Sequence, residues 1–222
     1  MPKVTEEYIQ KKKQQILEAA YQLCIEKTMG TVTMQDIINR TGLSQGGIYR
    51  FYHDIDEIFS EMILQLRQAV NLKEKIDKLF QEAESLKPKE IVNQVFTIVA
   101  DFLTEELMGG AKIDFELSVL AMNAPRRVEK ILSDMQEIGN MEYIRVQTFR
   151  YFVQKEKSGE LQPRIKLEEV MTFISSSVVG IQMSCIVNCC YNKMPMSEWY
   201  APKTQFMALA KSVNYLLGVE NF

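Results

Sequence analysis

The chain has 222 residues, more than one average domain, so we expect a small module followed by a larger one. Hydrophobic residues make up 46% and charged residues 25%, which is typical of a soluble globular protein with a substantial core. The formal net charge of −3 gives no support for nucleic-acid binding, so a prediction of that function must rest on local geometry.

Few residue patterns in the chain suit catalysis or metal binding. His53 is the only histidine, and Cys24, Cys185, Cys189 and Cys190 lack the Cys-x-x-Cys spacing of a zinc site. The three later thiols are interpreted as small buried residues, with redox sensing as the alternative. Without a glycine-rich phosphate loop after a strand or a nucleophile elbow, we expect no enzyme, and neither metal, cofactor nor catalytic residue.

The polar amino terminus, Met1-Pro-Lys-Val-Thr-Glu-Glu, is not a signal peptide, so a cytoplasmic protein is expected. Apolar residues recur at helical spacing almost everywhere and never alternate with a sustained period of two, which predicts an all-α fold. The first helix is expected to open after Thr5 and to end at Gly30. Its predicted buried stripe consists of Ile16, Ala19, Ala20 and Leu23.

Two short helices should follow, and a fourth should begin near Asp54 or Asp56. Its apolar face holds Ile58, Phe59, Met62, Ile63, Leu66 and Val70. The later elements are expected in this order: a solvated helix end or linker at 73–78, a helix from Pro88 to Gly109-Gly110, a short helix over 113–122, one long helix over 126–157, an uncharged helix over 171–190 and a last helix over 206–217.

The most informative residues lie between Thr33 and His53. Thr33-x-x-Asp36 has the spacing of a capping box, in which the threonine hydroxyl accepts a free helix-terminal amide. Gly42 can adopt a positive φ in a tight turn, and Ser44 is a good N-cap for a second short helix that turns Ile48 inward. A helix, a glycine-containing turn and a second helix predict a helix-turn-helix, whose second helix enters a major groove.

The second helix would point polar residues outward. Glutamine can read adenine and arginine can read guanine, whereas tyrosine hydroxyls and helix-terminal amides suit phosphates. Two adjacent glycines either allow the backbone to approach DNA closely or simply make a frayed surface helix. The outward residues are Gln45, Gly46, Gly47, Tyr49, Arg50 and His53.

This part of the chain resembles the TetR (tetracycline repressor-like) family over about the first 60 residues. The motifs that carry the resemblance are Ile16-Leu-Glu-Ala-Ala20, Thr33-x-x-Asp36-Ile37, Thr41-Gly-Leu-Ser44, Gly46-x-Ile-Tyr-x-x-Tyr52 and Asp56-Glu57. The resemblance implies a homodimeric regulator, usually a repressor, whose second, helical domain varies between members. It also implies a DNA-binding domain over 1–55 and a ligand-binding and dimerisation domain over 56–222.

The resemblance assigns roles to single residues. Thr33 and Tyr49 take positions that contact phosphate, and Ser44, as N-cap, opens the reading helix. Gln45, Gly46 and Gly47 take positions that read bases, and Arg50 takes a variable position that contacts bases or backbone. His53 and Ile55 stand where lysines are frequent, so phosphate anchoring would rest more on Lys11, Lys12 and Lys13, unless these are only a solvated helix start.

The uncharged stretch 171–190 is long enough to span a bilayer, but serines, a threonine, a glutamine and an asparagine interrupt it. We therefore predict a buried interface helix in a homodimer and no membrane partner, with small residues such as Ser176 and Gly180 allowing close approach.

The effector site is the least specified part of the sequence. Possible pocket walls include Phe96, Phe115, Met135 and Tyr143, although a role in the core is the favoured interpretation of each. Glu116 could pair with a cationic ligand, be exposed, or pair with Arg126, Arg127 or Arg145.

The sequence thus predicts a transcription regulator that binds near-palindromic, double-stranded operator DNA as a homodimer and releases it when a small-molecule effector binds. A helical adaptor protein whose helix-turn-helix is only structural is the alternative.

Overall fold

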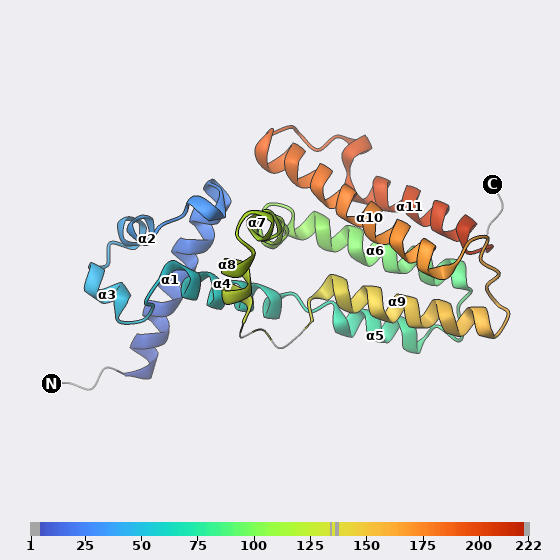
Figure 1. Ribbon diagram of the computed structural model, residues 1–222, viewed down its shortest axis with the longest axis horizontal. Helices are drawn as coiled ribbons and strands as arrows, with labels where there is room; N and C mark the ends of the chain where they lie inside the picture. The colour runs from blue at the N-terminus through green and yellow to red at the C-terminus, as the bar shows by residue number, and fades with distance from the viewer. Residues whose placement is uncertain (1–4, 134, 136–137, 220–222) are drawn as a thin grey trace. The chain divides into compact units, whose positions relative to one another are not determined.

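Every regular element that the structure describes is helical, as the spacing of apolar residues predicts (Figure 1). The protein is represented by a computed structural model that describes residues 5–133, 135 and 138–219. It divides into two compact units, Met1–Ala69 with Lys112–Glu137 and Val70–Ala111 with Ile138–Phe222. These two units are defined by how the helices pack. The predicted boundary between a DNA-binding domain, 1–55, and a ligand-binding domain, 56–222, concerns function and stays a prediction.

The first unit holds the amino-terminal helices and two later ones. Its elements are α1 (Glu6–Glu26), η1 (Met29–Thr31), α2 (Met34–Thr41), α3 (Gln45–Tyr49), α4 (Ile55–Ala69), α7 (Gly110–Asn123, of which the first two residues belong to the second unit) and α8 (Pro125–Leu132). Five of these helices each bury at least one large side chain completely in a common core, for example Ile16 from α1, Ile37 from α2, Ile48 from α3, Phe59 from α4 and Ile131 from α8.

The start of α1 is as predicted, because the Thr5 hydroxyl accepts the Tyr8 amide at 3.3 Å. The predicted end is wrong. Helix α1 stops at Glu26, and Gly30 lies in the following 3₁₀ turn η1. The Cys24 carbonyl near the end of α1 accepts a hydrogen bond from Lys112 in α7, so a partner far along the chain replaces a local glycine cap.

The second unit is a bundle of long helices. Its elements are α5 (Lys73–Gln81), α6 (Pro88–Glu106), α9 (Asn140–Lys157), α10 (Leu167–Ile186), η2 (Val187–Tyr191), η3 (Glu198–Tyr200) and α11 (Pro202–Leu216). Helix α6 packs on α11 and α5, α9 packs on α5 and α10, and α10 also packs on α11 (Figure 1). The bundle therefore closes on itself around an apolar interior.

The charged run 73–78 forms a helix of its own, α5, rather than a solvated end or linker. Two of its apolar residues, Ile76 and Leu79, are one turn apart, and both are buried. The start of α5 is held from elsewhere, because the Leu72 amide donates to the Asn140 side chain at 3.2 Å. Periodicity in so short and charged a stretch is too weak to show this helix.

The predicted long helix over 126–157 is in fact two helices, α8 and α9. Gly139 is the N-cap of α9 and has an extended backbone, with φ −65° and ψ 161°. The next residue, Asn140, also donates to the Val70 carbonyl at 2.7 Å. Contacts with residues about 70 positions earlier therefore fix where α9 begins.

The carboxy-terminal end of α11 packs against the segment that leads into α10. The Arg164 amide donates to the Leu216 carbonyl at 2.8 Å, and the Arg164 guanidinium lies 4.4 Å from the centroid of the Tyr215 ring. Gly218 ends the helix with φ +75°, and a Cβ there would lie 2.3 Å from the Gln162 carbonyl oxygen. Gly159 has a similar φ of +80° but open space around it.

This pair of glycines separates backbone strain from close packing. Gly159→Ala should lower the free energy of unfolding by about 1 kcal/mol, the cost of a left-handed alanine. Gly218→Ala should cost about 1–3 kcal/mol more, because the methyl group overlaps backbone. Urea unfolding followed by circular dichroism measures both, and equal costs would contradict the close approach at Gly218.

Candidate functional site

The predicted corner between α2 and α3 is present and fully capped. The Asp36 amide donates to the Thr33 hydroxyl at 3.2 Å, and the Thr33 amide donates to the Asp36 carboxylate at 2.8 Å, which confirms the capping box. Gly42 has φ +67° in the turn, and the Ser44 hydroxyl accepts the Gly47 amide at 3.2 Å at the start of α3. The corner is thus built from local hydrogen bonds.

Polar contacts from α1 and the residue after it hold this corner in place. Lys27 pairs with Asp36 at 2.7 Å, Arg40 makes a two-pronged pair with Glu26, and the Gln15 side chain donates to the Thr41 carbonyl at 3.0 Å. Hydrogen bonds from Lys27 and Thr33 lower the pKa of Asp36 to about 2. Both ends of α2 are therefore fastened to the α1 region.

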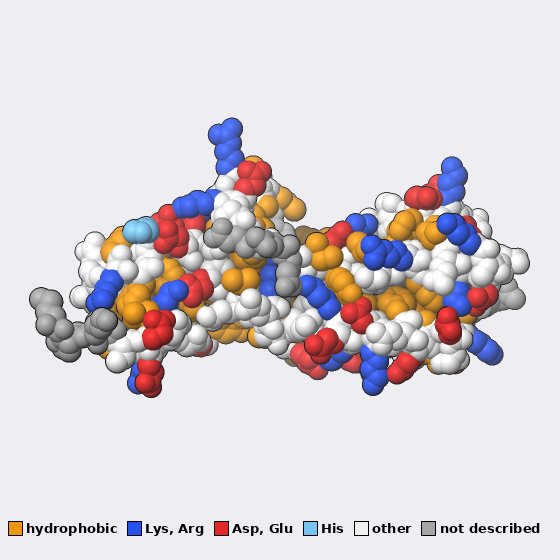
Figure 2. Space-filling view, turned by 90° about the horizontal axis from the view of Figure 1, so that it is seen from below, with side chains coloured by type: hydrophobic (Ala, Val, Ile, Leu, Met, Phe, Trp, Pro, Cys, Tyr) orange, Lys and Arg blue, Asp and Glu red, His pale blue; other side chains and the backbone are white. Residues whose placement is uncertain are grey.

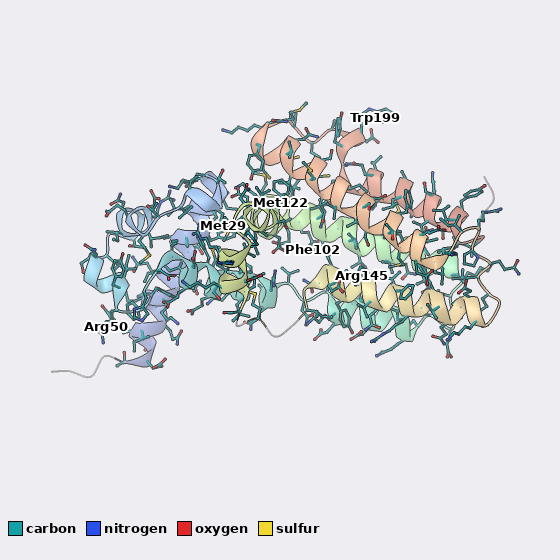
Figure 3. All side chains as sticks on the ribbon, in the orientation of Figure 1. Met29, Arg50, Phe102, Met122, Arg145 and Trp199 are labelled. Atoms are coloured by element: carbon teal, nitrogen blue, oxygen red, sulfur yellow. The ribbon has the colours of Figure 1, made fainter. Side chains whose placement is uncertain are left out.

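Most of the residues predicted to contact DNA are exposed. Ile48 is fully buried, whereas Tyr49 on the same helix is 41% exposed. Figure 3 shows Arg50 beside α3 at the edge of the first unit. Seven predicted contact residues are exposed, namely Thr33, Ser44, Gln45, Gly46, Tyr49, Arg50 and His53, and Gly47 is half-buried.

The two glycines of α3 have different surroundings. A Cβ on Gly47 would lie 3.1 Å from the Ser44 hydroxyl oxygen, so a side chain there would crowd the N-cap. A Cβ on Gly46 would meet nothing within 4 Å. Gly47 therefore has a role within the chain, whereas packing within the chain does not account for Gly46.

The lysines considered as phosphate anchors differ from one another. Lys13 pairs with Glu61 of α4 at 2.7 Å and lies 5.4 Å from the centroid of the buried Tyr52 ring. The Tyr52 hydroxyl donates to the same Glu61 at 3.0 Å, and burial raises its pKa. Lys13 thus fastens α1 to α4, whereas Lys11 is exposed. On the face shown in Figure 2, positive and negative side chains are interspersed, in keeping with the net charge of −3.

Glu116 lies in a buried ion pair that sequence reasoning missed. Its partner is Lys112, at 2.7 Å, and the two side chains are 3% and 4% exposed. Lys112 also donates to the Cys24 carbonyl at 2.5 Å, and Glu116 accepts the Met29 amide. The ion-pair partner of Glu116 is therefore Lys112 and not Arg126, Arg127 or Arg145, which the sequence analysis considered. The i, i+4 spacing of Lys112 and Glu116 on one helix was the signal that could have found the pair.

The second unit contains a cavity of about 200 Å³ between α6, α9 and α10. Its wall is mainly apolar, and Val179, which borders it, is 62% exposed, so the cavity is open along α10. The residues that line it are Val92, Val95, Phe96, Val99, Met141, Glu142, Ile144, Arg145, Thr148, Phe152, Met171, Ile174, Ser175, Val178, Val179 and Gln182.

The structure does not bring the five predicted effector residues together. Phe96 lines the cavity. Tyr143 lies on α9, but its hydroxyl donates to Asp77 of α5, which raises its pKa. Phe115, Glu116 and Met135 belong to the first unit, where Met135 accepts a hydrogen bond from Arg67.

Helix α10 has an unusual exposed side. Phe173, Val179 and Met183 are 40%, 62% and 52% exposed. In the part of the chain that the structure describes, the continuous helix Leu167–Tyr191 is long and apolar enough to cross a membrane, and only 28% of its most apolar stretch is buried. One helix of this kind is weak evidence for a membrane span, so the exposed side is better regarded as a surface that requires cover.

The cysteines differ in burial. Cys24 and Cys185 are buried, and burial raises the pKa of their thiols to about 12 and about 11, which disfavours the reactive thiolate. Cys189 and Cys190 are half-buried. Over residues 5–133, 135 and 138–219, no group of three or more His, Cys, Asp or Glu side chains is placed to hold a metal ion.

Comparisons with known proteins agree with this geometry. The model of the family "Bacterial regulatory proteins, tetR family" matches residues 16–62, from within α1 to within α4. YfiR, an HTH-type transcriptional regulator of Bacillus subtilis, is 27% identical over 187 residues, which cover 81% of this chain and 82% of YfiR.

Two solved structures share the fold. A TetR transcription regulator from Haloarcula marismortui has a TM-score of 0.60 and 12% identity, over 94% of this chain and 97% of that one. Thermus thermophilus FadR, a TetR-family repressor in complex with lauroyl-CoA, has a TM-score of 0.52 and 14% identity, over 95% and 97% of the two chains.

A capped, exposed helix-turn-helix at the amino terminus of an all-helical chain defines the class as a DNA-binding transcription regulator. Residues 16–62 match the TetR family of bacterial regulatory proteins, and most of the chain is similar to an HTH-type transcriptional regulator.

The buried pair makes a prediction about stability. Lys112→Met leaves Glu116 buried without its cation and should lower the free energy of unfolding by about 3–5 kcal/mol. In Lys112→Met with Glu116→Gln the unpaired charge is gone, and the amide oxygen can still accept the Met29 amide. Urea unfolding should therefore show the double variant to be more stable than Lys112→Met, and a less stable double variant would contradict the pairing.

Proposed function

We propose that this regulator is a repressor that binds a near-palindromic operator as a homodimer and leaves it when a small molecule occupies the cavity of the second unit. The observation that carries DNA binding is α3 itself, whose polar residues are exposed while Ile48 anchors it. Residues 1–55 would act as the DNA-binding domain and 56–222 as the ligand-binding and dimerisation domain. A regulator of this kind acts in the cytoplasm.

Within α3 and its flanks, Gln45 and Arg50 would contact base edges. Thr33, Ser44, Tyr49 and His53 would contact phosphates, together with the amides at the start of α3. The open space at Gly46 supports this proposal over a merely structural helix-turn-helix, because a glycine with no packing role suits close approach of backbone to DNA. Gly47 would serve the same approach while also leaving room for the Ser44 cap.

For the dimer, a second copy of the chain would cover the exposed side of α10. Small residues on that helix, among them Ser176 and Gly180, allow close approach, and Phe173 and Met183 provide apolar area. Two-fold symmetry would then place two copies of α3 on one duplex, which is why the operator would be near-palindromic.

Release by an effector requires that the ligand bind one spacing of the two reading helices more tightly than the other. Phe96 and the other residues of the cavity wall would contact this ligand, and FadR, which shares the fold, binds lauroyl-CoA. Two helices are suited to transmit the change. Helix α4 leads into the second unit at Val70, and α7 begins in the second unit and continues into the first, where Lys112 and Glu116 fasten it to the end of α1.

DNA reading is tested by gel-shift titration against the promoter region upstream of the gene that encodes the chain. Arg50→Ala and Gln45→Ala should each weaken specific binding about 5- to 150-fold, from about 1–3 kcal/mol per bidentate contact, and affect competitor DNA less. Lys75→Ala, an exposed charge on α5, is the matched control and should have no effect. Equal loss on specific and competitor DNA would show that neither residue reads bases.

The dimer is tested by analytical ultracentrifugation at micromolar concentration. Met183→Glu places a charge on the exposed side of α10 and should convert the dimer to a monomer and abolish operator binding, because a buried unpaired charge opposes association. Met122→Glu is the control, since Met122 is 83% exposed on α7. A monomeric unmodified protein, or a dimer that survives Met183→Glu, would refute this interface.

A further inference from the structure

The wall of the cavity is balanced in charge. Among the described residues that line it, Glu142 and Arg145 are the charged ones, and they pair with each other one turn apart on α9. The guanidinium donates to both carboxylate oxygens, at 2.8 and 2.6 Å. An ionic ligand would have to lose its water without an unpaired counter-charge to receive it, which is costly.

One polar group in the wall has no partner. Thr148 lies on α9, one turn before Phe152, and is 7% exposed. Its hydroxyl is buried and makes no hydrogen bond, not even to a carbonyl of its own helix. A hydroxyl can donate and accept, so any ligand group that hydrogen-bonds would relieve this unsatisfied state.

The size of the cavity limits what it can hold. An apolar cavity of about 150 Å³ accommodates benzene, so the 200 Å³ found here corresponds to roughly eight non-hydrogen atoms, with further room on the open side along α10. That is room for a compact ring system rather than for a long chain with a large polar head.

We propose that the cavity takes a compact, uncharged, mainly apolar molecule with one hydroxyl-like group that hydrogen-bonds to Thr148. This inference rests on the proposal that the cavity is the effector site, and it names the chemical class of that effector. The Glu142–Arg145 pair then serves as a neutral part of the wall rather than as a receptor for a charged group.

The test uses four probes that share one ring system: 1-naphthol, naphthalene, 1-naphthoate and 1-naphthylmethylammonium. Binding to the full-length protein is measured by calorimetry or by fluorescence. We expect 1-naphthol to bind about 5- to 10-fold more tightly than naphthalene, as one hydrogen bond predicts, and both ions to bind more weakly than 1-naphthol. Tighter binding of either ion, or no binding of any probe, would overturn the inference.

Thr148→Val removes the hydroxyl and keeps the shape of the side chain. The variant should fold with a melting temperature equal to or above that of the unmodified protein, because an unsatisfied buried group is gone. It should lose the preference for 1-naphthol over naphthalene, and Thr148→Ser should keep it. A preference that survives Thr148→Val would overturn the role of Thr148.

A gel shift with the operator separates this inference from the proposed function. If 1-naphthol binds as described and dissociates the operator complex, both stand. If it binds with the Thr148 dependence but leaves the operator complex intact, the effector role of the cavity fails and the ligand class stands. If another class of probe releases the operator, the ligand class fails and the effector role stands.

Discussion

The buried pair of Lys112 and Glu116 is the constraint on which the geometry of the first unit depends. Two charges that are almost completely removed from water need partners. Besides the other charge, Lys112 bonds to the Cys24 carbonyl near the end of α1, and Glu116 bonds to the Met29 amide in the turn that follows. The chain then enters α2 at Met34. Helix α7 therefore fixes the point from which α2 and α3 start. A movement of α7 must carry the end of α1 with it or leave a charge unpaired.

From that point the corner is maintained by its own hydrogen bonds. The Thr33–Asp36 box opens α2, and Ser44 caps α3, with Gly47 leaving room for the serine hydroxyl. A helix as short as α3 is not stable alone, so Ile48 in the core and these caps have to hold it. Because its stability comes from one buried side chain and one cap, the remaining positions are available for contacts outside the molecule.

In the second unit, helix α10 both borders the cavity and carries the exposed apolar surface. Helix α10 borders the cavity through Ile174, Ser175 and Val178, and it leaves Phe173 and Met183 exposed on its surface. A ligand that fills the cavity would therefore press on the same helix that the proposed partner subunit covers. This gives a physical route from ligand to subunit arrangement within one element, without requiring a long chain of intermediates.

The sequence by itself determined what depends on neighbours within a few residues: the helical class, the capping box at Thr33 and Asp36, the positive φ of Gly42 and the cap at Ser44. These are local because the bonded atoms lie two to four residues apart. Only the tertiary structure decided where α1 ends, that 73–78 is a helix, and that α9 begins at Asn140, since Lys112 and Asn140 bond to backbone groups about 70 to 90 positions earlier. The same holds for the effector residues. Whether Phe96 or Phe115 faces a cavity depends on which helices pack together, and an apolar side chain has the same periodicity in a core as in a pocket wall.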